Sequence, residues 1–328
     1  MKLTIIIPQY KEPEEVIFPL LSSINNQLGI DFSQLEVLVV NDCSNVILKK
    51  RFLSQFVNIK PRYIKLKKNV GLGMCRKAGM EHATGDYVMF CDADDMFYHA
   101  SALALFFNEI DMKHPDICTS SWLEEQKING CWHYLQHKIE ATWVHGKIFR
   151  RQFLIDNDIN FHPKFRVHED TYFVGLAFDM TTNKNYLDNI TYVWKYNENS
   201  FTRRDNASFS YKEFSVFIES VIELIRAIET RKPELLPYRV AQFLLYVYFS
   251  FHLPYWNIED SFQYKQKCEE IFSGFFKSYA RFYEQYPEEK FKELYKSEKE
   301  KLYSTREMEE KESLESFIRR MGGYSFSD

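Results

Sequence analysis

The sequence predicts an α/β protein of two parts. Residues 1–210 are expected to form a three-layer α/β/α domain on a mostly parallel sheet, and residues 211–328 a mainly helical domain. The first prediction rests on the first 120 residues, where short strand-like apolar runs alternate with longer segments of helical spacing, as in repeated βα units. The second rests on the apolar residues after Tyr211, which recur every three or four positions, as on one helix face.

The expected strands are short apolar or β-branched runs that end in polar or turn residues. They are Leu3–Ile7, Leu35–Val40, Arg62–Leu66, Tyr87–Cys91 and Asp116–Ser120. Helical spacing between them predicts helices over Glu14–Gln27, Val46–Phe56, Gly71–Ala83 and Ala100–Met112. Pro19 predicts a kink in the first helix or a later start. Residues 121–205 are mixed and rich in Trp, His and Arg.

Composition excludes several classes of protein. Hydrophobic residues make up 45% of the chain, which is typical of a globular protein. A net charge of −4 argues against nucleic acid as the main partner. The six cysteines lack the CxxC spacing of a zinc site and indicate a reducing, cytoplasmic location.

The sequence gives no sign of a membrane-spanning or signal segment. Met1 leads straight into a strand-like run, without the layout of a signal peptide. The most apolar stretch, Val240–Leu253, has 14 residues, whereas a spanning helix needs about 20. A buried or an interfacial helix is therefore expected there.

The Tyr87–Cys91 run ends in three carboxylates within four positions, Asp92, Asp94 and Asp95. Carboxylates this close repel one another, and hard divalent cations prefer such oxygen ligands. An acidic turn that caps a following helix is the alternative interpretation. Pro8 to Tyr10 and the Asn41-Asp42 pair also follow strands, so all three polar clusters are expected at the carboxyl edge of the sheet, where ligands bind.

The ordered set of motifs resembles the family 2 glycosyltransferases, which have the GT-A fold and use nucleotide-sugar donors. The resemblance spans about two thirds of the chain and ends near residue 210. The blocks that carry it are Ile5-Ile6-Ile7-Pro8-Gln9-Tyr10-Lys11-Glu12, Val39-Val40-Asn41-Asp42-Cys43-Ser44, Asn69 to Gly79, Asp92 to Asp95, Lys147 to Arg151, Glu169-Asp170 with Phe173, and Tyr196 to Ser200. The departures from the family pattern are Lys11 for Asn, Asn41 for Asp, Cys43 for Gly, Cys75 for Ala and Lys77 for Asn.

The resemblance implies an inverting, metal-dependent transfer of a hexose or N-acetylhexosamine from a UDP-sugar to a hydroxyl group. A glycan, a teichoic acid or a lipid-linked molecule is the expected acceptor. Mn²⁺ or Mg²⁺ is the expected cofactor, with Asp94 as its direct ligand. Asp92 is expected to meet either the donor ribose or the water shell of the metal. Asp95 is either a third partner or only a helix cap.

The resemblance also implies a set of donor-nucleotide contacts. They are Pro8, Tyr10, Glu12, Asp42, Arg76, Asp92 and Arg203. Asp42 is expected to bind the uracil ring N–H, with Pro8 and Tyr10 as walls around the base. Arg76 and Arg203 are expected to reach phosphate, and a solvated surface position is the alternative for both.

The acidic pair Glu169-Asp170 supplies the candidate base. By resemblance Asp170 takes the proton of the acceptor hydroxyl, while Glu169 orients or binds the acceptor. Trp143, His145 and His168 are candidate acceptor contacts, because sugars stack on aromatic faces. Plain core packing is the alternative for Trp143 and His145, and a structural role or a contact with the metal is the alternative for His168.

Two rival functions fit parts of the pattern. A nucleotidyltransferase also carries acidic pairs at strand ends, but the first strand here leads into Pro8 to Glu12 and not into a Gly-rich basic loop. A catalytically silent GT-A subunit that binds through its helical part is the second rival. The helical part itself is expected to serve oligomerisation, acceptor binding or peripheral docking at the inner face of the membrane through Phe243–Trp256.

Overall fold

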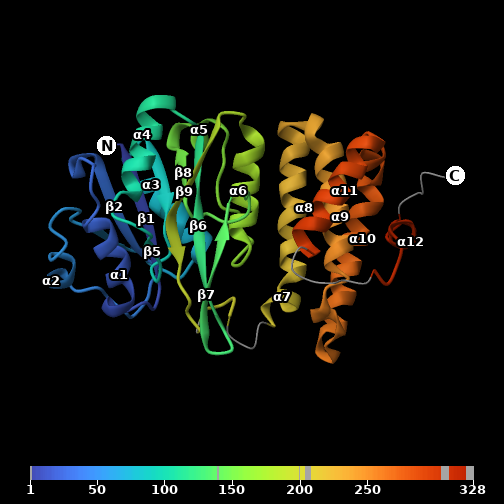
Figure 1. Cartoon of the computed structure of the whole chain (residues 1–328), viewed down its shortest axis with the longest axis horizontal. Coiled ribbons are helices and arrows are strands. Elements are labelled where there is room, and N and C mark those ends of the chain that lie inside the picture. The colour runs from blue at the N-terminus through green and yellow to red at the C-terminus, as the bar shows by residue number, and fades with distance from the viewer. Residues whose placement is uncertain (1, 139, 199, 204–207, 304–309, 323–328) are drawn as a thin grey trace. The chain divides into compact units, whose positions relative to one another are not determined.

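The computed structural model in Figure 1 describes the chain except for residues 1, 139, 199, 204–207, 304–309 and 323–328. The chain divides into two compact units, residues 1–197 and 198–328. This division lies earlier in the chain than residue 210, where the sequence places the end of the α/β domain.

One sheet forms the centre of the first unit. Its strands are β1 (Leu3–Gln9), β2 (Leu35–Asn41), β3 (Arg62–Lys65), β4 (Tyr87–Phe90), β5 (Met96–Phe97), β6 (Ile117–Ile128), β7 (Cys131–His137), β8 (Lys147–Arg150) and β9 (Lys184–Trp194). They are ordered β3-β2-β1-β4-β8-β6-β9-β5, and β7 pairs with β6. The five expected strands are all present, and Asp116–Ser120 is the start of the much longer β6.

The sheet is mixed, not mostly parallel as the sequence predicted, since half of its strand pairings are antiparallel. Strands β3, β2, β1 and β4 are parallel neighbours, as repeated βα units require. Beyond β4 the pairs β4–β8, β8–β6, β6–β7 and β9–β5 are antiparallel, and only β6–β9 is parallel. Asn129 and Gly130 close the β6–β7 hairpin, and both have positive φ, as a two-residue hairpin turn needs.

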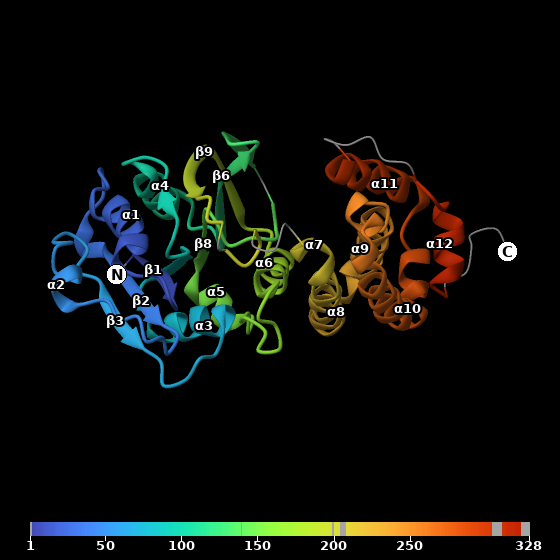
Figure 2. The same ribbon diagram turned by 90° about the horizontal axis from the view of Figure 1, so that it is seen from below.

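Helices cover both faces of this sheet, which confirms the three-layer α/β/α architecture (Figure 2). They are α1 (Glu14–Asn25), α2 (Lys50–Leu53), α3 (Leu72–His82), α4 (Ala102–Lys113), α5 (Arg151–Asp156) and α6 (Glu169–Met180), with a 3₁₀ turn at Phe32–Gln34. Helix α3 packs on β1 and β2, whereas α1 and α4 contact β5 and β9.

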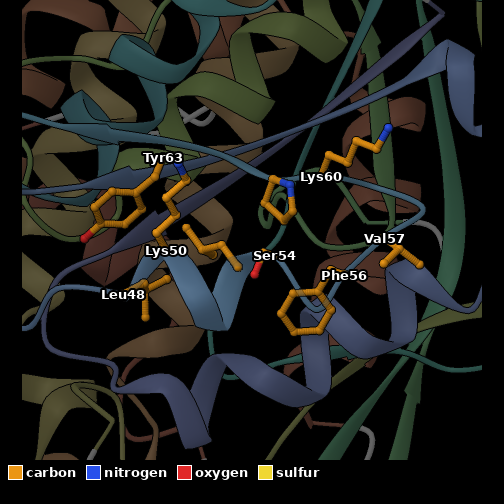
Figure 3. A pocket seen from close by; sticks show the side chains of 9 residues that line it. Leu48, Lys50, Ser54, Phe56, Val57, Lys60 and Tyr63 are labelled. Atoms are coloured by element: carbon orange, nitrogen blue, oxygen red, sulfur yellow. The ribbon is translucent and has the colours of Figure 1, made fainter.

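The prediction of a helix over Val46–Phe56 is wrong, because only α2, a single helical turn, forms in this segment. Hydrogen bonds to neighbouring side chains compete with a helix here. The carbonyl of Val46 accepts from the amides of Gln9 and Asn41, and the N–H of Lys49 donates to Glu14. The irregular segment borders a pocket of about 510 Å³ beside β3 (Figure 3).

Helix α3 approaches β1 closely at Gly79. A Cβ atom at this position would lie 2.3 Å from Cγ2 of Ile6, which is fully buried. We expect Gly79→Ala to destabilise the first unit by about 1–3 kcal/mol through overpacking, less the ~0.5–1 kcal/mol that Ala gains in a helix. Gly274→Ala is the matched control, because nothing lies within 4 Å of a Cβ there, and it should be neutral or stabilising. Urea denaturation measures both variants, and equal midpoints would contradict this packing.

The second unit is helical. Its helices are α7 (Phe209–Lys212), α8 (Phe214–Arg231), α9 (Leu236–Ser250), α10 (Phe262–Glu284), α11 (Glu288–Tyr303) and α12 (Leu314–Arg320), with 3₁₀ turns at Pro233–Leu235, Pro254–Asn257 and Glu259–Ser261. Helix α9 contacts α8, α10 and α11, and most of its side chains are buried. The apolar stretch Val240–Leu253 is therefore core. Among the described helices, none combines the length and apolarity that crossing a bilayer requires.

Burial also removes the basis for membrane docking through Phe243–Trp256. Phe243, Phe249, Phe251 and Trp256 are each less than a tenth exposed. These aromatic side chains pack inside the second unit and offer little surface to lipid.

Candidate active site

The end of β1 is fixed by the side chain of Gln9. Its Nε2 donates to the carbonyl of Glu12 at 2.9 Å, and its Oε1 accepts from the Tyr63 hydroxyl at 3.1 Å. The Glu12 carboxylate in turn accepts from the backbone N–H of Tyr10 at 2.7 Å. Pro8 is buried within the strand, while the Tyr10 ring is 42% exposed. The ammonium of Lys11 lies over the Tyr10 ring, 5.2 Å from its centroid, and Glu12 shapes the loop that carries both residues.

Asp42 holds the loop that precedes α3. Its carboxylate accepts from the N–H of Val70 at 2.7 Å, from the N–H of Gly71 at 2.9 Å and from the side chain of Asn69 at 2.9 Å. Gly71 has a φ of +87°, a conformation that favours glycine. Any contact of Asp42 with a base would share these oxygen atoms with the loop.

Arg76 is buried between two carboxylates. Its guanidinium donates to Oδ1 of Asp92 at 2.6 Å and to Oε1 of Glu169 at 2.7 Å, and the side chain is 2% exposed. Gly73, one turn earlier on α3, permits this approach, since a Cβ there would lie 2.8 Å from Cγ of Glu169. Arg76 therefore links the end of β4 to the start of α6. The expected contact with donor phosphate would have to compete with both ion pairs.

The turn after β4 is tied to β9 through Tyr192. The Tyr192 hydroxyl donates to Oδ2 of Asp95 at 2.6 Å and accepts from the N–H of Asp92 at 3.0 Å. The N–H of Lys195 donates to the other oxygen of Asp95 at 2.9 Å. Asp95 is fully buried and leads into β5, so it does not cap a helix.

These surroundings separate the acidities of two neighbouring carboxyls. Burial raises the pKa of Asp95 well above its ordinary value, and the charges of Asp92 and Asp94 add to the rise. Burial opposes ionisation of Asp92 as well, but Arg76 and then His145 outweigh it and hold the pKa of Asp92 below its ordinary value. Asp92 is therefore the firmly ionised member of this pair.

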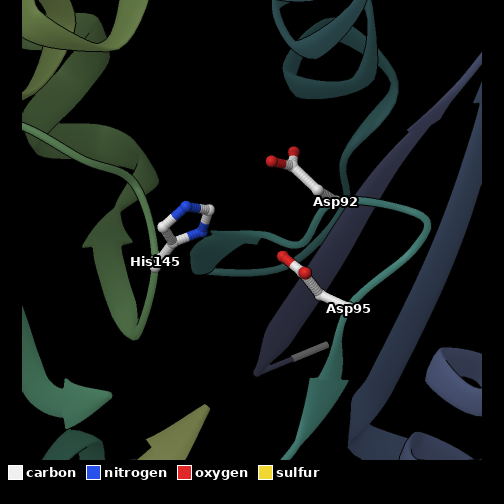
Figure 4. A group of neighbouring side chains, drawn as sticks. All are labelled: Asp92, Asp95 and His145. Atoms are coloured by element: carbon white, nitrogen blue, oxygen red, sulfur yellow. The ribbon is translucent and has the colours of Figure 1, made fainter. Parts of the chain in front are cut away.

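His145 faces the carboxylates of Asp92 and Asp95 from the loop before β8 (Figure 4). Potential ligand atoms of these three residues all lie within 4.8 Å of one another. The Nδ1 atom of His145 is buried without a hydrogen-bond partner. Burial lowers the pKa of His145 to about 4 against the opposing charge of Asp92, so the imidazole is neutral at pH 7. A neutral imidazole beside two carboxylates is a donor set that a divalent metal ion can use.

Asp94, the expected metal ligand, is not one of this group of three. Its Oδ2 accepts from the amide of Asn197 at 2.9 Å. Asp94 is only partly buried, unlike Asp95.

The expected acceptor contacts lie in two places. Trp143 is half-buried and packs edge-on against Trp194, with ring centroids 4.9 Å apart. His145 stacks on Trp194 and on Tyr192, so this loop packs against the aromatic side chains of β9. His168 lies elsewhere, with a φ of +57° in the turn that begins α6, and burial lowers its pKa to about 4.

The two carboxyls at the start of α6 differ in their partners. Glu169 is buried and bound by Arg76, whereas Asp170 is half-buried and accepts only from the N–H of Thr171 among the described hydrogen bonds. Burial, followed by the charge of Glu169, raises the pKa of Asp170 well above its ordinary value. Glu169 also has a raised pKa from burial, which Arg76 opposes. Asp170 is thus the basic carboxylate that remains available.

One buried ion pair is absent from the sequence-based predictions. Lys147 on β8 is fully buried and pairs with Glu140, which also accepts from the N–H groups of Thr142 and Trp143. The pair holds the loop that carries Trp143 and His145. A lysine beside the apolar Ile148 and Phe149 in a strand is the signal that could have revealed this ion pair.

Arg203 lies in the second unit. Its expected contact with the donor phosphate stays a prediction.

The fold and the acidic turns at the sheet edge define the class of GT-A glycosyltransferases. In a solved structure, Staphylococcus aureus TarS in complex with UDP-GlcNAc matches 93% of this chain and 93% of its own with a TM-score of 0.68 and 21% identity. A mannosyltransferase from Pyrobaculum calidifontis in complex with GDP-Man and Mn²⁺ covers 82% of this chain and 84% of its own, with a TM-score of 0.51 and 14% identity. Both likenesses concern the fold.

The chain belongs to glycosyl transferase family 2, whose model matches residues 4–167. It is similar to the poly(ribitol-phosphate) β-N-acetylglucosaminyltransferase TarS of Staphylococcus aureus, with 28% identity over 196 residues. That match covers 54% of this chain and 32% of the relative, so the chain spans about a third of that relative's length. The family membership sets aside the nucleotidyltransferase alternative.

Proposed function

We propose that this protein transfers N-acetylglucosamine from UDP-GlcNAc, with inversion, to a hydroxyl group of a teichoic-acid-type polymer. The observation that carries the proposal is the Arg76 bridge, which joins a carboxylate turn suited to the donor to an acidic pair suited to the acceptor. The similarity to TarS supports the choice of donor and acceptor.

Asp94 and Asp92, on the turn after β4, would hold the metal ion, as Mn²⁺ or Mg²⁺, and His145, which faces Asp92, is a further candidate ligand. When bound, such an ion acts as a Lewis acid that neutralises the charge developing on the UDP leaving group. The unpartnered Nδ1 of His145 supports His145 as that further ligand, because a buried polar atom usually has a partner. Asp95 would support the turn through Tyr192, since both its oxygen atoms already accept hydrogen bonds.

Asp170 would act as the base. Its carboxylate takes the proton from the acceptor hydroxyl as that oxygen attacks the anomeric carbon of the donor sugar. Glu169 orients this step through Arg76 and leaves Asp170 free of a competing cation at hydrogen-bond distance. Tyr10 and Asp42 would contact the uracil base, as the exposed Tyr10 ring allows.

The pH dependence of the reaction tests the role of Arg76. Asp170 must be ionised to accept a proton, so kcat/KM should rise with pH through the raised pKa of Asp170 and level off above it. Arg76 lowers that pKa, so Arg76→Met should move the rise to higher pH, while Arg76→Lys should move it less. A pH profile that stays in place in Arg76→Met would remove Arg76 from this role.

Donor identity tests the proposal as a whole. We expect isothermal calorimetry with Mn²⁺ to show tighter binding of UDP-GlcNAc than of UDP-glucose or GDP-mannose. Release of UDP from UDP-GlcNAc should accompany it, slowly without acceptor and faster with poly(ribitol phosphate). Tighter binding of GDP-mannose would overturn the choice of donor, and absence of UDP release under every condition would favour a catalytically silent subunit.

A further inference from the structure

Positive charge is concentrated in one segment of the first unit. Between Asp42 and Glu81 the chain has ten Lys and Arg residues and no Asp or Glu, although the net charge of the whole chain is −4. Arg76 belongs to the active site and Arg62 pairs with Glu36. The other eight come before, within and after the edge strand β3 in the chain and are called the basic face below, namely Lys49, Lys50, Arg51, Lys60, Lys65, Lys67, Lys68 and Lys77.

The basic face is available to a partner. Seven of its eight side chains are exposed, and Lys77 is partly exposed. No carboxylate among the described residues lies within ion-pair distance of any of them. Lysines on an edge strand such as β3 also discourage edge-to-edge pairing, but only Lys65 of the basic face lies in that strand. Protection of the sheet edge therefore accounts for Lys65 alone and does not account for the other seven basic side chains of this face.

Apolar surface is interleaved with these charges. The pocket of about 510 Å³ in Figure 3 combines Lys50 and Lys60 with apolar side chains such as Val57, which is 65% exposed. Ile47, in the same segment, is 43% exposed. A second hollow of about 280 Å³ combines Lys67, Lys68 and Lys77 with Leu66, Val70 and Met74. The two hollows lie before and after β3 in the chain, and neither shares a residue with the carboxylate site.

We propose that the basic face docks the protein on a bilayer that contains anionic lipids. Ammonium and guanidinium groups are attracted to an anionic headgroup layer, and each contributes to binding at short range. Exposed apolar side chains such as Ile47 and Val57 add affinity for the headgroup and acyl boundary. A hydrophilic polyanion would pair with the lysines but gain nothing from these apolar side chains, so the mixed surface favours a bilayer.

Docking through this face would place the proposed active site close to acceptors that are attached to the membrane. The loop after β3 carries Lys67 and Lys68 and continues into Asn69 to Gly71, which Asp42 holds at the carboxyl edge of the sheet. Lys67 and Lys68 of the basic face therefore adjoin the donor side of the proposed site. The bilayer would keep that edge near membrane-attached acceptors. Catalysis with soluble substrates does not require this contact, so docking goes beyond the proposed function.

Vesicle sedimentation with the full chain tests the proposal. The probes are vesicles of phosphatidylcholine alone and vesicles with 30% phosphatidylglycerol, each at about 0.05 and 0.3 M salt. We expect binding to the anionic vesicles only, and weaker binding at the higher salt concentration, because salt shortens the distance over which charges attract. One variant combines four substitutions, Lys50→Gln, Lys60→Gln, Lys67→Gln and Lys68→Gln. Since each lysine contributes roughly fivefold to binding, this variant should bind about 10²- to 10³-fold more weakly.

Matched variants separate this surface from charge in general. Lys267→Gln, Lys277→Gln, Lys290→Gln and Lys296→Gln remove the same charge from exposed positions of the second unit and should bind as the parent does. Val57→Ser should weaken vesicle binding but leave binding of soluble polyphosphate unchanged. UDP release from UDP-GlcNAc should be unaltered in every variant, so loss of docking and failure of the proposed function are distinguishable.

Three results would overturn the proposal. They are equal binding to both kinds of vesicle, parental binding by the Lys50, Lys60, Lys67 and Lys68 variant, and tight binding of polyphosphate without vesicle binding. The last result would assign the basic face to a soluble polyanion.

Discussion

Replacement of Asp170 by Asn is expected to lower turnover about 10²- to 10⁴-fold and to leave UDP-GlcNAc binding nearly unchanged. Asn has almost the same shape and its side-chain oxygen can still accept from the N–H of Thr171, but it cannot take a proton. Asp170 also makes no ion pair with Arg76, which binds Glu169 instead. The change should therefore remove the base without disturbing the fold.

The comparison with Glu169→Gln makes this prediction specific. That variant weakens a buried ion pair, so it should lower thermal stability as well as turnover. Steady-state UDP release, calorimetry and melting temperature measure the three effects. An Asp170→Asn variant that turns over at nearly the parental rate would exclude Asp170 as the base.

Replacement of Asp94 by Ala is expected to abolish the gain in UDP affinity that Mn²⁺ gives. Asp94 is partly buried at the turn after β4, and its replacement removes the proposed carboxylate ligand without breaking the Tyr192 and Lys195 contacts of Asp95. Calorimetry of UDP binding with and without Mn²⁺ measures the gain. Binding of UDP without metal should change little.

Asp95→Asn is the matched variant. Its amide can keep one of the two hydrogen bonds of Asp95, so we expect lower stability with the Mn²⁺ response retained. If Asp95→Asn loses the response and Asp94→Ala keeps it, the ion is held by the group that the structure brings together, Asp92, Asp95 and His145.

Local patterns predicted the parallel half of the fold. Apolar runs closed by turn residues sufficed for β1, β2 and β4, because all three are buried, and the short edge strand β3 follows the same βα alternation. The antiparallel half depends on long-range pairing that no local pattern encodes. Strand β8, for example, lies between β4 and β6, and β6 continues far beyond Ser120 into a hairpin.

The site was predictable where its residues cluster in sequence. The carboxylates after β4 and the pair at α6 stood out as short motifs. The partnership of Arg76 with Glu169 did not, because 93 positions separate them and only the close packing allowed by Gly73 joins them. His145 was expected against an acceptor, yet the fold turns it toward Asp92 and Asp95.

The most direct test of the central claim is the anomeric configuration of the first product. Proton NMR can follow slow hydrolysis of UDP-GlcNAc, an α-linked donor, by this protein with Mn²⁺ before the free sugar equilibrates. The proposed single displacement with Asp170 as base predicts that β-N-acetylglucosamine appears first and the α anomer follows by mutarotation. Initial release of the α anomer would contradict inverting transfer at this site.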